Sequence, residues 1–215
     1  VYVFDSFENS SQKSIDRIKQ LLNSKKGNLA KNLHLFKGDI RNKENLEELF
    51  LNLKNQKKYF YAVMHFAGLK SVRESVLNPI KYWEFNVKGT INLIEVMNFF
   101  SCRIFVFSSS ASVYGISSKT LLNEDDPINP VNPYALTKSV IEKFLDNVSL
   151  KSNECWKIAN LRYFNPIGAH PSGLIGEDPS GKPNNIYPQI TKVAIGEIDE
   201  IKIFGSDWPT NDGTG

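Results

Sequence analysis

Short apolar runs alternate with amphipathic segments along the first two-thirds of the chain. The apolar runs predict five strands, at residues 1–4, 33–36, 59–66, 103–108 and 158–163. The third and fourth runs are almost continuously apolar, which is typical of strands covered on both faces of a parallel sheet.

Helical spacing of apolar residues predicts a helix between each pair of successive strands. The helices are expected at about residues 15–22, 46–53, 79–99 and 134–150, with Gly27 after the first and Asn42 as a cap for the second. The last two follow an asparagine-proline pair, a capping residue before a residue suited to the first helical position. This order predicts an α/β fold, a doubly wound parallel sheet of the Rossmann-like kind.

The pattern changes after Phe164, where proline and glycine become frequent and only residues 186–196 look helical. Loop-rich regions of this kind commonly carry ligand contacts. We therefore expect residues 1–163 to form one domain and residues 164–215 to form part of a smaller, loop-rich substrate domain.

Composition and charge restrict the possible partners. A net charge of +3 over 215 residues fits a diphosphate ligand but is too small to indicate nucleic acid, and no apolar run is long enough to indicate a membrane. Cys102 and Cys155 have neither metal-ligand spacing nor the number needed for a disulfide framework. We therefore expect no metal and a reduced, cytoplasmic location.

Residues that suit a dinucleotide follow three of the predicted strands. Asp5 ends the first strand, where an acid can accept hydrogen bonds from the ribose hydroxyls of NAD, and Asp39 ends the second. The third strand runs into Ala67 and Gly68, whose small size lets a cofactor approach the backbone. Because parallel strands present their carboxyl ends at one edge, these residues are expected to lie near one another.

The fourth strand ends in three serines, and the next helix opens with Tyr134 and Lys138, four residues apart on one helix face. A free tyrosine titrates near pH 10, so half-ionisation at pH 7 requires its pKa to fall by ~3 units, or about 4 kcal/mol. Lys138 and a cationic nicotinamide in a dry pocket could supply this shift. Tyr134 would then act as a general base toward a sugar hydroxyl, with Ser110 as a short proton relay.

Blocks of sequence in order along the chain carry a family resemblance. They lie at residues 5–10, 38–41, 65–70, 86–90, 108–115, 132–138, 161–173, 176–185 and 203–215, and include LRYFNPIGAHPSG and IFGSDWPTNDGTG. On these blocks the chain resembles the extended short-chain dehydrogenase/reductase family and, within it, the UDP-glucose 4-epimerases.

The resemblance implies reversible 4-epimerisation of UDP-glucose and UDP-galactose through a 4-keto intermediate, with tightly bound NAD, in galactose metabolism. It implies a homodimer packed through the helices that flank the serine strand. The catalytic residues implied are Ser110, Tyr134 and Lys138. NAD contacts are implied for Asp5, Ser6, Phe7, Glu8, Asn9, Ser10, Asp39, Ile40, Phe66, Ala67, Gly68, Lys70, Asn86, Ser110, Tyr134, Lys138 and Phe164. UDP-sugar contacts are implied for Ser110, Tyr134, Asn165, Asn185, Ile186, Lys202, Ile203 and Phe204.

The resemblance also implies a first strand with a phosphate-binding glycine loop, and later residues that complete the substrate site. Val1 is not a methionine and already lies in a predicted strand, and the last matching block runs to Gly215. We therefore expect both segments to lie outside residues 1–215. Without that first strand, the sheet is expected to divide into two parts.

Three other functions were weighed against this one. Related 4,6-dehydratases carry an acidic pair just after the serine strand, and Ala111 and Ser112 stand there in this chain, which disfavours dehydration. A 4-epimerase of another UDP-sugar, either an acetamido sugar or a pentose, remains an alternative. A non-catalytic NAD-binding regulator also remains, although Ser110, Tyr134 and Lys138 argue against it.

Overall fold

The computed structural model describes residues 1–24, 27–119, 121–151, 155–177, 185–203, 205–208 and 210–214. Within these residues, five strands form two parallel sheets in the order β1–β2 and β3–β4–β5. The strands are β1 Tyr2–Asp5, β2 His34–Lys37, β3 Val63–His65, β4 Ile104–Ser110 and β5 Lys157–Tyr163. The predicted α/β fold with a parallel sheet is confirmed, and the sheet is divided in two as expected.

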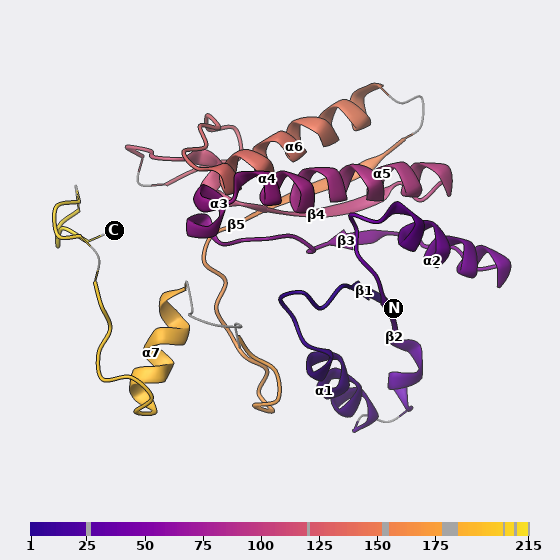
Figure 1. The fold of residues 1–215 in the computed structure, drawn as a ribbon, viewed down its shortest axis with the longest axis horizontal. Coiled ribbons are helices and arrows are strands. Elements are labelled where there is room, and N and C mark those ends of the chain that lie inside the picture. Colours follow the sequence, from indigo (N-terminus) through magenta and orange to yellow (C-terminus); the bar gives the residue numbers. More distant parts are fainter. Residues whose placement is uncertain are drawn as a thin grey trace.

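Helices connect the strands in the predicted order (Figure 1). They are α1 Gln12–Asn23, α2 Lys43–Asn55, α3 Val72–Leu77, α4 Pro79–Tyr82, α5 Gly89–Phe99, α6 Pro133–Lys151 and α7 Ile186–Ala194, with 3₁₀ turns at Leu29–Asn32 and Ala111–Tyr114. The helix predicted over residues 79–99 is not uniform, because a π-helical segment, Trp83–Lys88, lies between α4 and α5.

Side-chain caps explain where several helices begin. The Asn42 and Asn132 side chains each accept a hydrogen bond from the backbone N–H three residues later, at 3.2 and 2.9 Å, as predicted for α2 and α6. Ser71 caps α3 in the same way at 3.2 Å. The sequence did not predict α3, since six residues are too few to show an apolar helical period.

The third strand is shorter than predicted. Only Val63–His65 pairs with β4, whereas Tyr59 and Tyr61 are 71% and 84% exposed. Phe60, between them, packs against Phe50 with ring centres 4.7 Å apart. At the start of the predicted strand at residues 59–66, side chains therefore alternate between core and solvent. The apolar composition of this run did not predict which of them are exposed.

Helices α2, α5 and α6 contribute to one core against the three-stranded sheet. Phe105 and Phe107 of β4 are fully buried in it, together with Leu145 of α6. Figure 1 shows α5 and α6 running alongside β4 and β5. Met64 and Leu161 point away from this core and are 62% and 37% exposed. The sequence predicted strands covered on both faces, but the described residues leave the second face of this sheet much more open.

Residues 164–214 follow the end of β5, and α7 is the one helix in their described part. Figure 1 shows α7 and the segment after it set apart from α5 and α6. The boundary proposed between residues 163 and 164 stays a prediction. Across the described ranges, no helix combines the length and apolar character needed to cross a membrane.

Candidate active site

Three side chains of α6 face three consecutive serines at the end of β4. Lys138 Nζ donates a hydrogen bond to the Ser108 carbonyl at 2.8 Å, and the Ser109 hydroxyl donates to Glu142 Oε1 at 2.5 Å. Ser110 is hydrogen-bonded to the phenol of Tyr134. Because Tyr134, Lys138 and Glu142 are spaced by four residues, they share one helix face. The structure therefore brings together Ser110, Tyr134 and Lys138, as the sequence predicted.

Tyr134 is held in apolar surroundings. It packs against Tyr82, with ring centres 6.5 Å apart, beside the buried side chains of Leu69 and Phe85. Burial raises the pKa of Tyr134, and the hydrogen bond from Ser110 opposes that rise. The sequence assigned a lowered pKa to Lys138 together with a cationic nicotinamide. In the chain alone the pKa is raised, because desolvation of the phenolate outweighs the stabilisation from Ser110.

The Lys138 side chain is almost fully buried, with 6% of the residue exposed. Its Nζ lies 4.8 Å from the centre of the Phe107 ring and 5.9 Å from that of Tyr134. Desolvation lowers the pKa of Lys138 to about 8. The ammonium is thus still the major form at pH 7, close enough to favour a negative charge on Tyr134.

Ser112 determines the direction of the Ser110 proton. The backbone N–H and the hydroxyl of Ser112 both donate to Ser110 Oγ, at 3.2 and 2.9 Å. A hydroxyl has two acceptor positions and one proton. With both acceptor positions used, Ser110 can only donate, and Tyr134 is the partner that it meets. The sequence identified Ser112 only as a non-acidic residue and missed this role.

The loop after β3 is fixed by Asn86. Its side-chain amide accepts from Leu69 N at 2.8 Å and donates to Leu69 O at 3.1 Å and to Thr137 Oγ1 at 3.2 Å. Gly68 has a φ of +149°, and a Cβ there would stand 2.9 Å from Asn86 Oδ1. The predicted contact of Asn86 with NAD stays a prediction, and in the structure its amide binds the loop and α6. It positions the loop beside Lys138.

His65 has a structural role at the end of β3, where it is 4% exposed. Its Nε2 lies 2.9 Å from Thr90 Oγ1, and the Thr90 hydroxyl donates to the Asn86 carbonyl at 2.6 Å. The Thr90 oxygen therefore accepts from His65, which places the imidazole proton on Nε2. Burial, reinforced by the charge of Lys138, lowers the pKa of His65 to about 3.

The loops after β1 and β2 are linked by a charged cluster. Asp5 accepts from Phe7 N at 2.7 Å and from the Ser10 hydroxyl at 2.8 Å. Arg41 pairs with Glu8 at 3.1 Å and with Asp39, and it lies 3.6 Å from the centre of the Phe85 ring. Hydrogen bonds from Arg41 hold the pKa of Asp39 below its usual value. The predicted residues Asp5 to Ser10 thus lie at one edge with Asp39.

The other predicted cofactor residues on these loops differ in how much of their side chains is exposed. The side chain of Ile40 packs in the core against Gly89, so only the backbone of Ile40 is presented at the loop after β2. Its carbonyl accepts from Asn92 Nδ2 at 3.0 Å. Phe66 and Ala67 follow β3 as predicted, and the Phe66 side chain is 56% exposed.

Among the predicted substrate residues of the loop-rich region, Asn185 is linked to a predicted cofactor residue. Glu177, which the sequence did not single out, lies 3.9 Å from Lys70 Nζ and accepts from Asn185 Nδ2 at 2.8 Å. It thereby joins a predicted cofactor residue to a predicted substrate residue. The exposed residues Phe164, Asn165, Ile186, Lys202 and Ile203 lie on the loops after β5, at the start of α7 and after it, and Phe204 lies outside the described residues.

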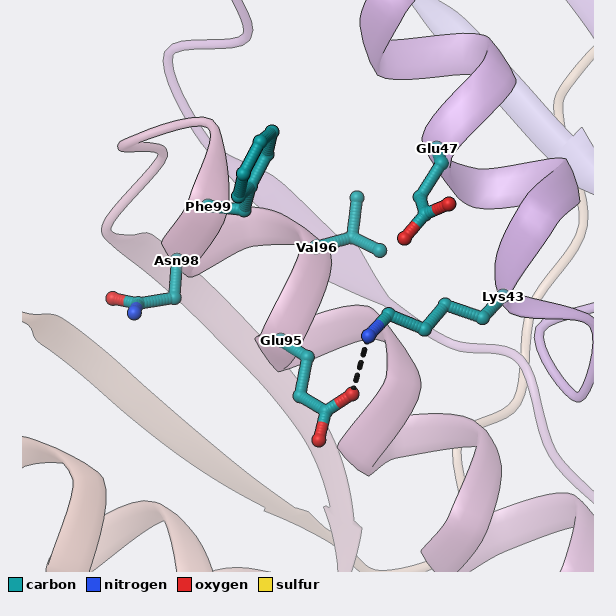
Figure 2. Close-up of a pocket in the computed structure, with 6 residues that line it drawn as sticks. All are labelled: Lys43, Glu47, Glu95, Val96, Asn98 and Phe99. Atoms are coloured by element: carbon teal, nitrogen blue, oxygen red, sulfur yellow. Dashed lines mark hydrogen bonds and ion pairs between the residues drawn. The ribbon is translucent and has the colours of Figure 1, made fainter.

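A hollow lies on the surface between α2 and α5, away from the Tyr134 site. Figure 2 shows Lys43 and Glu47 facing residues of α5, with Lys43 and Glu95 ion-paired at 2.8 Å. None of the predicted site residues lines this hollow. In the described part of the chain, no group of three or more histidine, cysteine or acidic side chains is arranged to hold a metal ion.

Glu142 and Ser112 are the residues of this site that sequence reasoning missed. Glu142 follows Lys138 by four residues, so continuing the helical spacing that identified Tyr134 and Lys138 could have found it. Ser112 had no such signal, because its contact with Ser110 depends on the 3₁₀ turn after β4.

The chain is similar in sequence to proteins of known family. A family model described as GDP-mannose 4,6 dehydratase matches residues 1–215. The bifunctional UDP-glucose 4-epimerase and UDP-xylose 4-epimerase 1 of Pisum sativum is 46% identical over 214 residues, which are 100% of this chain and 59% of that protein. UDP-glucose 4-epimerase of Bacillus subtilis (strain 168) is 42% identical over 215 residues, 60% of its length.

Solved structures are similar over the same span. UDP-glucose 4-epimerase from Bifidobacterium longum, in complex with NAD+ and UDP, is 39% identical with a TM-score of 0.88, covering 100% of this chain and 61% of that one. The enzyme from Stenotrophomonas maltophila, with bound NAD and formylated UDP-arabinopyranose, is 38% identical with a TM-score of 0.87 and 60% of its chain covered. The chain thus spans about 60% of the length of the relatives that it matches.

Proposed function

This chain belongs to the GDP-mannose 4,6 dehydratase family, and we propose that its protein is an NAD-dependent 4-epimerase that interconverts UDP-glucose and UDP-galactose. The observation that carries the proposal is the set of contacts between Ser110, Tyr134 and Lys138 in a buried setting at the end of β4. The names of the relatives from Pisum sativum and Bacillus subtilis support the same activity.

The chain's residues fit a dinucleotide. The ends of β1 and β2 present the carboxylates of Asp5 and Asp39, and Gly68 brings a loop backbone close to Lys138. When bound, NAD would accept a hydride from C4 of the sugar and return it to the opposite face. Lys70, joined to Asn185 through Glu177, would lie where the cofactor and substrate regions meet.

The chain's own residues handle the proton. Tyr134 removes it from the sugar 4-hydroxyl as the 4-keto form appears, and gives it back on reduction. Ser110, whose acceptor positions are filled by Ser112, donates to the phenolate oxygen and so stabilises it. The positive charge of the Lys138 ammonium stabilises the phenolate further. Burial raises the pKa of Tyr134 in the chain alone, and the positive charge of an oxidised nicotinamide would favour the phenolate and oppose that rise.

Ala111 and Ser112 distinguish this chain from the dehydratases for which the family is named. Elimination of water needs an acid and a base near C5 and C6 of the sugar, and neither side chain can act as a carboxylic acid. We therefore assign epimerisation and not dehydration.

A second substrate is favoured by one comparison. The Pisum sativum relative is named as acting on UDP-xylose as well as UDP-glucose. We therefore include UDP-pentoses among the candidate substrates.

Homodimer formation through α5 and α6 and a cytoplasmic location stay predictions. Both helices carry exposed apolar residues, with Phe99 78% and Leu136 41% exposed, which is compatible with a contact between subunits.

The test is an epimerase assay on the full-length protein with UDP-galactose, UDP-xylose and UDP-N-acetylglucosamine. We expect turnover of UDP-galactose, and we expect Tyr134→Phe to lower kcat by about 10²–10⁴-fold, the usual contribution of a general base. Lys143→Gln, an exposed change on the same helix, is the control. Unchanged kcat for Tyr134→Phe would refute the catalytic assignment.

A further inference from the structure

Glu142, on the same face of α6 as Tyr134 and Lys138, forms an ion pair with Arg162 of β5. Arg162 donates from Nε to both Glu142 carboxylate oxygens, at 3.1 and 3.2 Å, and from Nη2 to Oε2 at 2.8 Å. The side chains are 4% and 17% exposed. The pair is therefore well shielded from water and held in a single geometry by several hydrogen bonds.

Further hydrogen bonds tie this pair to its surroundings. Ser109 of β4 donates to Glu142 at 2.5 Å, and Arg162 Nη1 donates to the Tyr114 hydroxyl and to the Glu124 carbonyl, both at 2.8 Å. The pair thus joins α6, β4 and β5 to the 3₁₀ turn and the loop that follow β4. Each of these segments borders the site of Ser110 and Tyr134.

A buried ion pair is weak as a source of stability, because desolvation of the two charges offsets most of their attraction. Its better-attested use is to fix a register between elements. Three hydrogen bonds define the register of α6 on β4. Lys138 bonds to Ser108, Glu142 bonds to Ser109, and Tyr134 bonds to Ser110. A slide of α6 by one residue would displace it along its axis by about 1.5 Å.

On the basis of the proposed function, we propose that Glu142 and Arg162 are positioning residues for the reaction. They hold α6 against β4 so that the Tyr134 phenol meets the Ser110 hydroxyl. Neither residue touches the reacting atoms. Their effect runs through Ser109, the neighbour of Ser110, and through the helix that carries Tyr134. Displacement of about 1 Å at a catalytic group can lower a rate by about 100-fold, so a small loss of register is sufficient.

The experiment uses Glu142→Gln and Arg162→Lys in the full-length protein with UDP-galactose. We expect both to lower kcat by roughly 10–100-fold while KM changes less than about 3-fold, since neither Glu142 nor Arg162 is a predicted substrate contact. The kcat–pH profile should also move to higher pH, because a weaker contact with Ser110 favours the phenolate less. Lys43→Gln, which breaks the exposed pair with Glu95 (Figure 2), is the matched control and should change neither.

Two further variants keep the inference testable if those proteins fold poorly. Ser109→Ala removes only the bond from β4 to Glu142 and should lower kcat with the same change in pH profile. In a Ser110→Ala background, Glu142→Gln should lower kcat much less than in the wild type, because the contact that it positions is already absent.

The outcomes separate the two proposals. If the variants melt at lower temperature but keep kcat and the pH profile of the wild type, the pair is merely structural and the positioning role is wrong. If the wild-type protein turns over none of the UDP-sugars, the proposed function fails first. An active wild type with an inactive Tyr134→Phe leaves the function standing whatever Glu142→Gln does.

Discussion

At the scale of one residue, burial of the Lys138 ammonium lowers the stability of the fold, and the same buried charge lies beside the proposed general base. The ammonium is buried between β4 and α6, with one hydrogen bond to the Ser108 carbonyl and a pKa lowered to about 8. The pKa is lower in the folded chain than in the unfolded one, so folding disfavours the charged form. This penalty is fully present below about pH 8 and disappears as the pH rises toward about 10.5.

We predict that Lys138→Met stabilises the NAD-free protein at pH 7 and abolishes most of its activity. The lowered pKa corresponds to about 3 kcal/mol, of which loss of the bond to Ser108 removes about 1 kcal/mol. The free energy of unfolding should therefore rise by about 2 kcal/mol at pH 7, and the gain should vanish by pH 10. Urea denaturation at both pH values measures this.

The matched control for that prediction is Lys143→Met, an exposed lysine of the same helix, which should show no such pH dependence. A Lys138→Met protein that is less stable than the wild type at pH 7 would contradict the penalty.

The sequence predicted the residues of the site better than their contacts. Tyr134 and Lys138 could be found because helical spacing places them on one face, and Ser110 because it ends a buried strand. The direction of the Ser110 proton and the ion pair of Glu142 could not be found, since both depend on which elements pack side by side. The fall in the pKa of Tyr134 that was expected with Lys138 and bound NAD stays a prediction, since in the chain alone burial raises this pKa more than Ser110 lowers it.

At the scale of elements, the π-helical segment between α4 and α5 is the feature that a uniform helical period could not predict. It carries Asn86, which is 1% exposed and holds both backbone groups of Leu69. Strand and helix order were predictable from apolar spacing and from caps such as Asn42 and Asn132. The limits of β3 were not, because they depend on pairing with β4 and not on composition.

We predict that Asn86→Ala destabilises the protein by about 2–6 kcal/mol and weakens retention of NAD. The change leaves Leu69 N and O buried without their partners, and each such group carries a penalty of about 1–3 kcal/mol. Denaturant titration measures the first effect and dialysis against NAD-free buffer measures the second. Asn98→Ala, an exposed asparagine on α5, should change stability by less than about 0.5 kcal/mol. Equal effects for the two variants would contradict the positioning role of Asn86.

At the scale of the whole molecule, the described strands form two separate sheets. One face of the sheet β3–β4–β5 carries exposed apolar side chains. Met64 and Leu161 lie on that face, and Phe164 follows it with 66% of its surface exposed. Exposed apolar sheet surface and unpaired strand edges favour association. The sequence predicted the division of the sheet from strand order, but it could not show which side chains that division exposes.

We predict that residues 1–215, produced alone, bind a hydrophobic dye strongly, associate, and hold NAD poorly compared with the full-length protein. Fluorescence of anilinonaphthalene sulfonate and size-exclusion chromatography measure the first two properties, and absorbance of released NAD measures the third. A monomeric chain with cooperative unfolding, tight NAD binding and no dye signal would contradict this prediction.

The three serines that close β4 also set a limit on how this chain can vary. Side chains along a strand alternate between its two faces, so Ser109 meets Glu142 of α6 only in its present register. A single inserted or deleted residue in β4 would reverse every side chain beyond it. Ser109 would then turn away from α6, and Ser110 would turn from Tyr134. Homologous chains should therefore tolerate exchanges of residue type in this strand far more readily than changes in its length.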